Sequence, residues 1–222
     1  MSDIEIILKR AVHEVHPGSI LNLGIGLPTQ LLDYLPDDLD VMIHSENGVL
    51  GAWKQAPREE MSASLIDAAG AYISTVKGCS FFDSAVSFAM IRRSKIDLTM
   101  IGAFEVDQEG NLANWKIPGK FSPGIGGAME LAQKTPRIVV LSTHCDKHGK
   151  PKILTKCRLP VTAYHCVSRI ITDKAVLDVT PDGLLVTEMA AGMTPESLQA
   201  ITEAPLIFAA DTLDLTEEVK LS

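Results

Sequence analysis

The fold class follows from the stretch Ser19-Ile-Leu-Asn-Leu-Gly-Ile-Gly-Leu-Pro-Thr29. Its first part, Ser19 to Leu23, is a short apolar run that is typical of a buried strand. Gly24-Ile25-Gly26 then predicts a tight loop, and Pro28 suits the first turn of a helix that continues to Tyr34. The predicted order is strand, tight loop and helix, which is the unit from which α/β proteins are built.

The same alternation of strands and helices continues on both sides of this stretch. Before it, apolar residues recur at helical spacing from Ile4 to Val15, and His16-Pro17-Gly18 ends that helix. After it, we expect strands at Val41–His44, Asp97–Ala103 and Arg137–Thr143, a helix at Phe81–Arg93 and an antiparallel hairpin at Val176–Met189. We therefore predict an α/β three-layer sandwich with a mixed, largely parallel sheet, in a single domain over residues 1–222.

Composition and charge narrow the classes of function. The chain has 222 residues, of which 46% are hydrophobic and 22% are charged, as in folded globular domains. Its formal net charge of −8 provides no basic field, which argues against nucleic acid or a membrane surface as the main partner. The sequence shows neither a membrane-spanning apolar run nor the basic start of a secretory signal, so we expect a cytoplasmic protein. We expect reduced, mostly buried thiols at the sparse cysteines, Cys79, Cys145, Cys157 and Cys166.

Two stretches resemble known motifs only superficially. The glycines of Asn22–Thr29 suggest a dinucleotide-binding loop, but Thr29 stands where the third glycine belongs, which favours a packing turn. Asn22, Gly24 and Gly26 stay secondary candidates. His144–His148 contains possible metal ligands, but it follows a strand and enters a turn, so we expect a solvated loop and no metal site. No Gly-x-Ser-x-Gly motif supports a serine hydrolase.

The segment His44-Ser-Glu-Asn-Gly-Val-Leu-Gly51 places a carboxylate, Glu46, at the end of a hydrophobic strand, where α/β folds bind ligands. The alternative is a simple turn built on Asn47-Gly48 with a solvated glutamate. A second glycine cluster at Pro123–Met129 precedes a predicted helix, so backbone N–H groups could collect there as an anion-binding nest. A nucleophile and an oxyanion hole are the parts that acyl transfer requires.

His44-Ser-Glu-Asn-Gly-x-x-Gly51 resembles the active-site signature of family I coenzyme A transferases, specifically the B (β) subunit of the 3-oxoacid type. Other stretches resemble this family in the same order, namely Asn22–Thr29, Ser87–Arg92, Leu112–Trp115, Ile117–Lys120 and Gly126–Met129. The resemblance covers the chain from about Ile4 to Phe208. It implies that Glu46 is the nucleophile, that Gly127 and Gly126 form the oxyanion hole, and that substrate and CoA contact Asn22, Gly24, Gly26, Asn47 and Ala128.

The resemblance also implies a reaction. Glu46 attacks an acyl-CoA to give a mixed anhydride, and the released CoA thiolate then forms a glutamyl-CoA thioester that the acceptor acid opens. Because one thioester replaces another, neither a bound cofactor nor a metal is needed, and coenzyme A enters as a substrate. The implied partners are a separate A (α) subunit, an acyl-CoA and a carboxylic acid, with a 3-oxoacid such as acetoacetate as the default.

One departure from the family pattern concerns the acid. Asp67-Ala68-Ala69-Gly70 stands where family members commonly have Asn-Ala-Gly-Lys, so an acidic residue appears and a lysine is missing. We therefore assign Asp67 and Gly70 to specificity and expect a preference for acids that carry an amino or other donor group. Two other functions stay open: a sugar-phosphate isomerase of related fold, in which the carboxylate is a base, and a non-catalytic acyl-CoA-binding regulator, in which Glu46 is dispensable.

Overall fold

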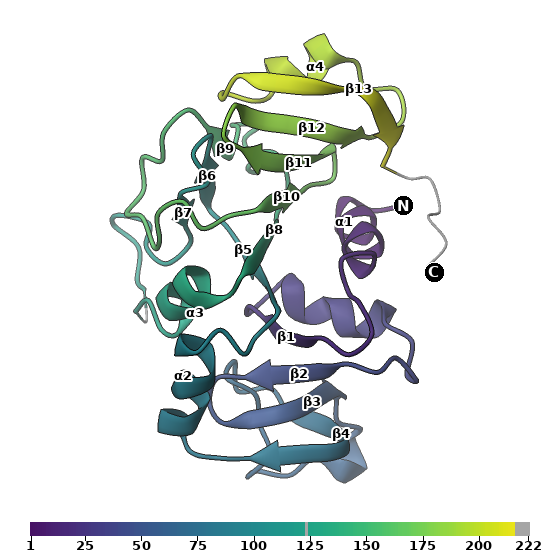
Figure 1. The fold of residues 1–222 in the computed structure, drawn as a ribbon, viewed down its shortest axis with the longest axis vertical. Helices are drawn as coiled ribbons and strands as arrows, with labels where there is room; N and C mark the ends of the chain where they lie inside the picture. Colours follow the sequence, from purple (N-terminus) through teal and green to yellow (C-terminus); the bar gives the residue numbers. More distant parts are fainter. Residues whose placement is uncertain (123, 216–222) are drawn as a thin grey trace.

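The computed structural model of the protein describes residues 1–122 and 124–215 (Figure 1). The helices are α1 (Asp3–Val12), α2 (Ser84–Arg92), α3 (Ala128–Lys134), α4 (Pro195–Ala200) and the 3-10 helices η1 (Pro28–Tyr34) and η2 (Arg58–Glu60). The strands of the large sheet are β1 (Ile20–Leu23), β2 (Met42–Ser45), β3 (Val49–Gln55), β4 (Ile73–Phe81), β5 (Leu98–Gly102), β8 (Arg137–Leu141), β10 (Arg169–Ile171), β11 (Ala175–Thr180), β12 (Gly183–Met189) and β13 (Leu206–Asp214). A small second sheet contains β6 (Glu105–Asp107), β7 (Leu112–Ala113) and β9 (Ile153–Leu154).

The large sheet is mixed. Within the described residues it has ten strands in the order β13-β12-β11-β10-β8-β5-β1-β2-β3-β4 (Figure 1). The neighbours from β10 to β2 are parallel, β3 and β4 add antiparallel strands at one end, and β11 and β12 form an antiparallel hairpin near the other. The predicted mixed sheet with a parallel centre and the predicted C-terminal hairpin are therefore confirmed.

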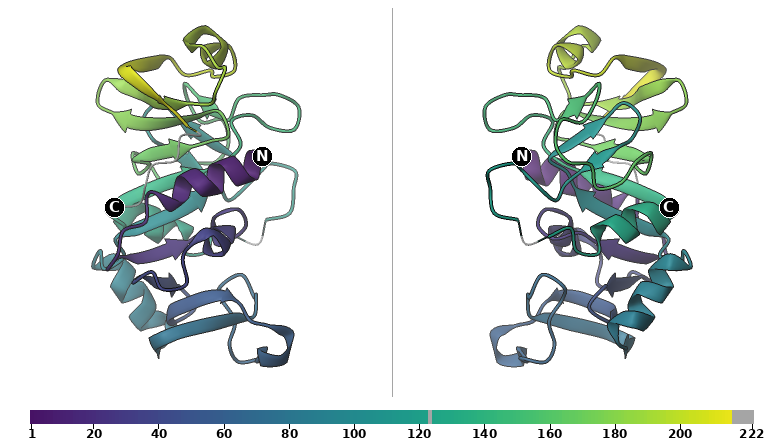
Figure 2. Two further views of the ribbon diagram at one scale, coloured as in Figure 1. Left: turned by 90° about the vertical axis from the view of Figure 1, so that its right-hand side faces the viewer. Right: turned by 90° about the vertical axis from the view of Figure 1, so that its left-hand side faces the viewer.

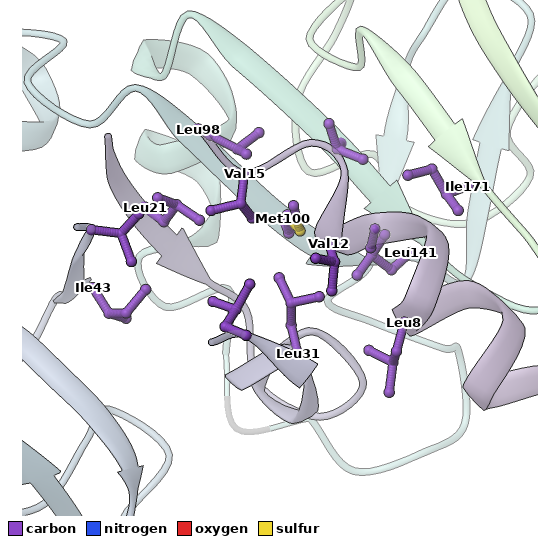
Figure 3. Close-up of a cluster of buried hydrophobic side chains, with 14 of the residues drawn as sticks. Leu8, Val12, Val15, Leu21, Leu31, Ile43, Leu98, Met100, Leu141 and Ile171 are labelled. Atoms are coloured by element: carbon purple, nitrogen blue, oxygen red, sulfur yellow. The ribbon is translucent and has the colours of Figure 1, made fainter. Parts of the chain in front are cut away.

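Both faces of the central strands are covered, because successive side chains point to opposite faces of a sheet. Met100 of β5 packs in one core with Leu8 of α1 and Leu31 of η1 (Figure 3). Its neighbour Ile101 belongs with Val140 of β8 to a second core, which includes residues of α3, α4 and the small sheet. Figure 2 shows α1 in front of the sheet in one view and behind it in the other. This arrangement confirms the three-layer α/β fold, while the single-domain assignment stays a prediction.

Helix α1 forms where the apolar spacing predicts it. The Ser2 side chain caps its start by accepting a hydrogen bond from the Glu5 backbone N–H at 3.2 Å. Acidic residues in the first turn and basic residues in the last turn complement the helix dipole. Ile7, Leu8 and Ala11 on one face of the helix are buried against the sheet.

The helix predicted at Phe81–Arg93 begins later than expected, at Ser84, and Phe81 ends strand β4 instead. Asp83 sets this boundary, because its side chain accepts a hydrogen bond from the Val86 backbone N–H at 2.8 Å. An aspartate at this position stops the helix from extending backwards, although the apolar residues before it continue the pattern. The boundary matters because it leaves Phe82 in the connection beside the candidate site.

The prediction of a solvated loop at residues 144–148 is wrong for His144. The side chain is 1% exposed, and its Nδ1 and Nε2 lie 3.0 Å and 2.8 Å from the hydroxyl oxygens of Thr172 and Thr202. Burial lowers the pKa of His144 to about 4. The two threonines lie far along the chain, so the sequence pattern around His144 gave no sign of these partners. Residues 147–150 are exposed, as expected.

The four cysteines are free and partly buried. In the part of the chain that the structure describes, no helix is long and apolar enough to cross a membrane. No group of three or more His, Cys, Asp or Glu side chains in residues 1–122 and 124–215 is arranged to hold a metal ion. The cytoplasmic location stays a prediction.

Candidate active site

Glu46 lies beside Asn22 at the carboxyl ends of two neighbouring parallel strands. Asn22 of β1 pairs with His44 of β2, and Glu46 follows directly after β2. The Asn22 Nδ2 atom lies 3.3 Å from Glu46 Oε2 and donates a hydrogen bond to it. Asn22 is buried whereas Glu46 is half-buried, so the glutamate is held from below and reachable from outside. This is the edge of the sheet at which α/β folds bind ligands.

A tight turn after β2 presents Glu46. The Gly48 N–H donates to the Ser45 carbonyl oxygen at 3.0 Å, and the Gly48 carbonyl accepts from Phe82 N–H at 3.0 Å. Gly48 has φ of +119°, a conformation that residues with a Cβ rarely adopt. A Cβ at this position would also overlap the Phe82 carbonyl oxygen. The turn therefore needs glycine for two separate reasons.

We expect Gly48→Ala to destabilise the protein by about 2 kcal/mol or more, since it adds backbone strain and a steric overlap. Gly70→Ala is the matched control, because Gly70 also has positive φ, +83°, but has open space around it. We expect that control to cost only about 1 kcal/mol. Denaturant unfolding of both variants measures the difference, and equal losses would show that the overlap at Gly48 is relieved at no cost.

Gly127 approaches Glu46 from the other side. It precedes the first residue of α3, and a Cβ built on it would lie 3.3 Å from Glu46 Cγ and 3.3 Å from Phe88 Cζ. The same position is 3.6 Å from Glu46 Oε1. The structure thus brings together the two glycine-containing segments that the sequence suggested as nucleophile and oxyanion hole. Gly126 and Ala128 flank this contact, and Gly126 has a positive φ of +56° with no neighbour within 4 Å of an added Cβ.

Three other predicted binding residues have local contacts. Gly24 packs against β5, where its N–H donates to Met100 O at 2.8 Å. The Gly26 carbonyl accepts a hydrogen bond from the Thr29 hydroxyl at 2.8 Å, which closes the loop before η1. The exposed Asn47 donates from Nδ2 to Ile66 O at 2.7 Å and so ties the turn to the segment before Asp67. These contacts explain why the residues suit the fold, and their assignment to binding stays a prediction.

The loop that carries Asp67 lies against the base of the Glu46 turn. The Ala68 N–H donates to Ser45 Oγ at 3.0 Å, and Asp67 Oδ1 accepts from the N–H groups of Ala69 and Ala71 at 2.9 Å and 2.8 Å. Asp67 therefore stabilises its own turn through one oxygen. Gly70 lies at the tip of this turn, where its N–H donates to Asp67 O at 3.0 Å.

A small cavity opens between this loop and the strand ends. Glu46 and Asp67 are its acidic lining residues, and no lysine or arginine lines it among the residues that the structure describes. The remaining lining residues are mostly apolar, namely Leu23, Ile25, Leu32, Ile43, Ala52, Trp53, Ala68, Ala69 and Ile73, with Thr29, His44 and Ser45 as polar members. The cavity is therefore apolar, with an excess of negative charge.

Sequence reasoning missed two buried polar residues at this site. His44 and Ser87 are 1% and 0% exposed, and His44 Nε2 lies 2.9 Å from Ser87 Oγ. A histidine at the end of an otherwise apolar strand was a signal that could have identified the first of them. Nothing in the local pattern of α2 distinguishes Ser87, because its contact with β2 arises only from the packing of the helix on the sheet.

A model of the family described as coenzyme A transferase matches residues 4–200. This chain belongs to the coenzyme A transferase family. The predicted family and the predicted enzyme class, a CoA-transferase of the beta type, are therefore confirmed. Membership also favours a transferase over the sugar-phosphate isomerase that the sequence left open.

Relatives with similar sequences cover nearly the whole chain. The beta subunit of a probable coenzyme A transferase from Bacillus subtilis is 47% identical over 93% of this chain and 95% of its own length. The beta subunit of an acetate CoA-transferase from Haemophilus influenzae is 44% identical over 95% of this chain and 94% of its own length. The corresponding polypeptide of a probable succinyl-CoA:3-ketoacid coenzyme A transferase from Bacillus subtilis, designated B, is 44% identical over 93% of this chain and 96% of its own length.

A solved structure supports the fold. The apoenzyme of an acyl-CoA transferase from Escherichia coli O157:H7 superposes with a TM-score of 0.78 at 19% sequence identity. The match covers 96% of this chain but 43% of that chain, so this chain spans less than half of the longer enzyme.

Proposed function

We propose that this chain is the beta subunit of an enzyme that moves CoA from an acyl-CoA to a carboxylic acid through a glutamyl-CoA thioester on Glu46. The observation that carries the proposal is the position of Glu46, between the Asn22 amide and Gly127 at the carboxyl edge of the parallel strands. A carboxylate held in this way can act as a nucleophile and stay accessible to substrate.

The chemistry follows from this placement. A Glu46 oxygen attacks the thioester carbonyl carbon, and the C–S bond breaks as CoA leaves as a thiolate. The thiolate then attacks the glutamyl carbonyl of the resulting anhydride, releases the donor acid and leaves CoA on Glu46. The acceptor acid repeats these steps in reverse. Each attack produces an oxyanion, which the backbone N–H of Gly127 is placed to stabilise, and one such donor contributes about 3 kcal/mol.

Initial-rate kinetics test this proposal. With an acyl-CoA and an acceptor acid varied together, a covalent intermediate predicts parallel double-reciprocal lines. Intersecting lines would indicate that both substrates bind before any transfer, and would contradict the glutamyl-CoA route.

We further propose that a separate A subunit completes the enzyme. The three relatives above are designated beta or B over nearly their whole length. Gly127 supplies donors from one side of Glu46, and a tetrahedral oxyanion is best held by two donors. The A subunit is therefore the proposed source of the second donor and of part of the CoA channel.

The identity of the acid is a finer proposal. The similar relatives are named for acetate and for a 3-ketoacid, so acetoacetate is the default acceptor. The negative cavity favours acids that carry an amino group, since Asp67 Oδ2 takes no part in the hydrogen bonds that fix its turn. A cationic group near this oxygen gains attraction that a neutral 3-oxo group does not.

We expect 3-aminobutyrate to be used about tenfold better than acetoacetate, judged by kcat/KM as acceptors, with butyrate as the uncharged control. Asp67→Asn removes the charge and should abolish this preference while leaving butyrate unchanged. Gly70→Lys should shift the preference back toward ordinary acids. A clear preference of the unmodified enzyme for acetoacetate would count against this specificity.

A further inference from the structure

Three buried polar side chains form a continuous chain of contacts behind Glu46. Asn22, His44 and Ser87 come from β1, β2 and α2, and none is more than 1% exposed. Burying a polar group without a partner costs free energy, so such a cluster persists where its members satisfy one another. The contacts run from Ser87 to His44, from His44 to Asn22 and from Asn22 to Glu46.

The orientation of the Asn22 amide is fixed by two oxygen atoms. Its Nδ2 lies 3.0 Å from the His44 carbonyl oxygen and 3.3 Å from Glu46 Oε2. Turning the amide over would place Oδ1 against both oxygens, and three acceptors would then face one another. The Nδ2 group must therefore point toward them and donate.

This orientation in turn fixes the tautomer of His44. The same Nδ2 atom lies 3.2 Å from His44 Nδ1, and an amide nitrogen can only donate, so Nδ1 is the acceptor. The ring proton is then on Nε2, which donates to Ser87 Oγ at 2.9 Å. Burial lowers the pKa of His44 to about 4, so the ring is neutral near pH 7 and keeps the lone pair on Nδ1.

We propose that His44 is a positioning residue for the nucleophile. Its Nδ1 holds the Asn22 amide with an N–H directed at Glu46 Oε2, and Ser87 holds the ring in the required tautomer. Oε2 is thereby occupied, and Oε1, on the side of Gly127, is left as the attacking oxygen. The inference rests on the proposed function, in which Glu46 attacks the thioester.

The test compares two substitutions that separate positioning from packing. His44→Phe keeps a ring beside Phe82, whose ring centroid lies 6.5 Å from that of His44, but removes the acceptor. His44→Asn loses ring volume but places an oxygen acceptor near the position of Nδ1. If His44 only fills space, Phe is the milder change, whereas if it positions Asn22, Asn is the milder change for the chemical step.

The readout is the rate at which the active form of the protein, together with the A subunit, forms the covalent CoA adduct from acyl-CoA. We expect His44→Phe to slow adduct formation by about 10- to 100-fold with little change in KM, because misplacing a reacting group mainly affects the chemical step. We expect His44→Asn to stay within about fivefold of the unmodified protein despite a lower melting temperature. Ser87→Ala should give a smaller loss than His44→Phe.

Adduct formation in His44→Phe at the unmodified rate, or activity that follows melting temperature in both variants, would overturn the inference. An unmodified protein that forms no adduct at all would overturn the proposed function and this inference with it. An adduct that forms equally fast in the unmodified protein and in His44→Phe would overturn this inference alone.

Discussion

Glu46→Ala is expected to reduce CoA transfer by at least about a hundredfold while the protein stays folded, because the substitution removes the group that forms the covalent bond. Folding should be little affected, since Glu46 lies in a turn after β2, is half-buried and belongs to neither main core. The measurement is the transfer rate, with thermal unfolding as the check on folding.

Glu60→Ala is the control for this substitution. It removes an exposed carboxylate from η2, so it changes the net charge in the same way without touching the cavity. Its transfer rate should equal that of the unmodified protein. If Glu46→Ala retained more than about a hundredth of the transfer rate, Glu46 would be dispensable and the non-catalytic alternative would be favoured.

The second large effect concerns the partner. The purified chain alone is expected to show no transfer, and activity should appear on addition of an A subunit and saturate with its concentration. Large apolar side chains are exposed on the isolated chain, among them Phe121 (93%), Ile25 (66%) and Phe81 (62%). Ile25 also lines the Glu46 cavity, and Phe121 precedes the Gly126-Gly127 segment. Exposed apolar groups near a site are typical of an interaction surface.

The same surface predicts that the chain alone associates with itself, which size-exclusion chromatography at several concentrations detects. Addition of the A subunit should replace this self-association with a defined complex. Full transfer activity from the purified chain alone would contradict a site shared between two subunits.

The central architecture could be predicted from the sequence because its signals are local. The apolar runs of β1, β5 and β8 are continuous, and the turn at residues 181–183 marks the hairpin of β11 and β12. The hairpin of β3 and β4 was not predicted, because its pairing is interrupted by register shifts and its alternation is irregular. The start of α2 was misplaced because one capping residue, Asp83, outweighs the apolar pattern.

The candidate site was only partly predictable. Glu46 could be singled out because a carboxylate at the end of a buried strand is unusual for a purely structural residue. Its contact with Gly127 and the hydrogen bonds from Asn22 to His44 depend on which strands and helices become neighbours, and no local pattern encodes that. For the same reason His144 was misjudged, since its partners Thr172 and Thr202 come from distant segments.

The most direct test of the account is a mass measurement on Glu46 itself. The protein in its active form is incubated with acyl-CoA and no acceptor acid, digested, and its peptides are weighed. We predict that the peptide containing Glu46 gains the mass of CoA, that hydroxylamine removes the addition, and that Glu46→Ala shows none. An unmodified Glu46 peptide under conditions of active transfer, or an adduct on another residue, would contradict the account.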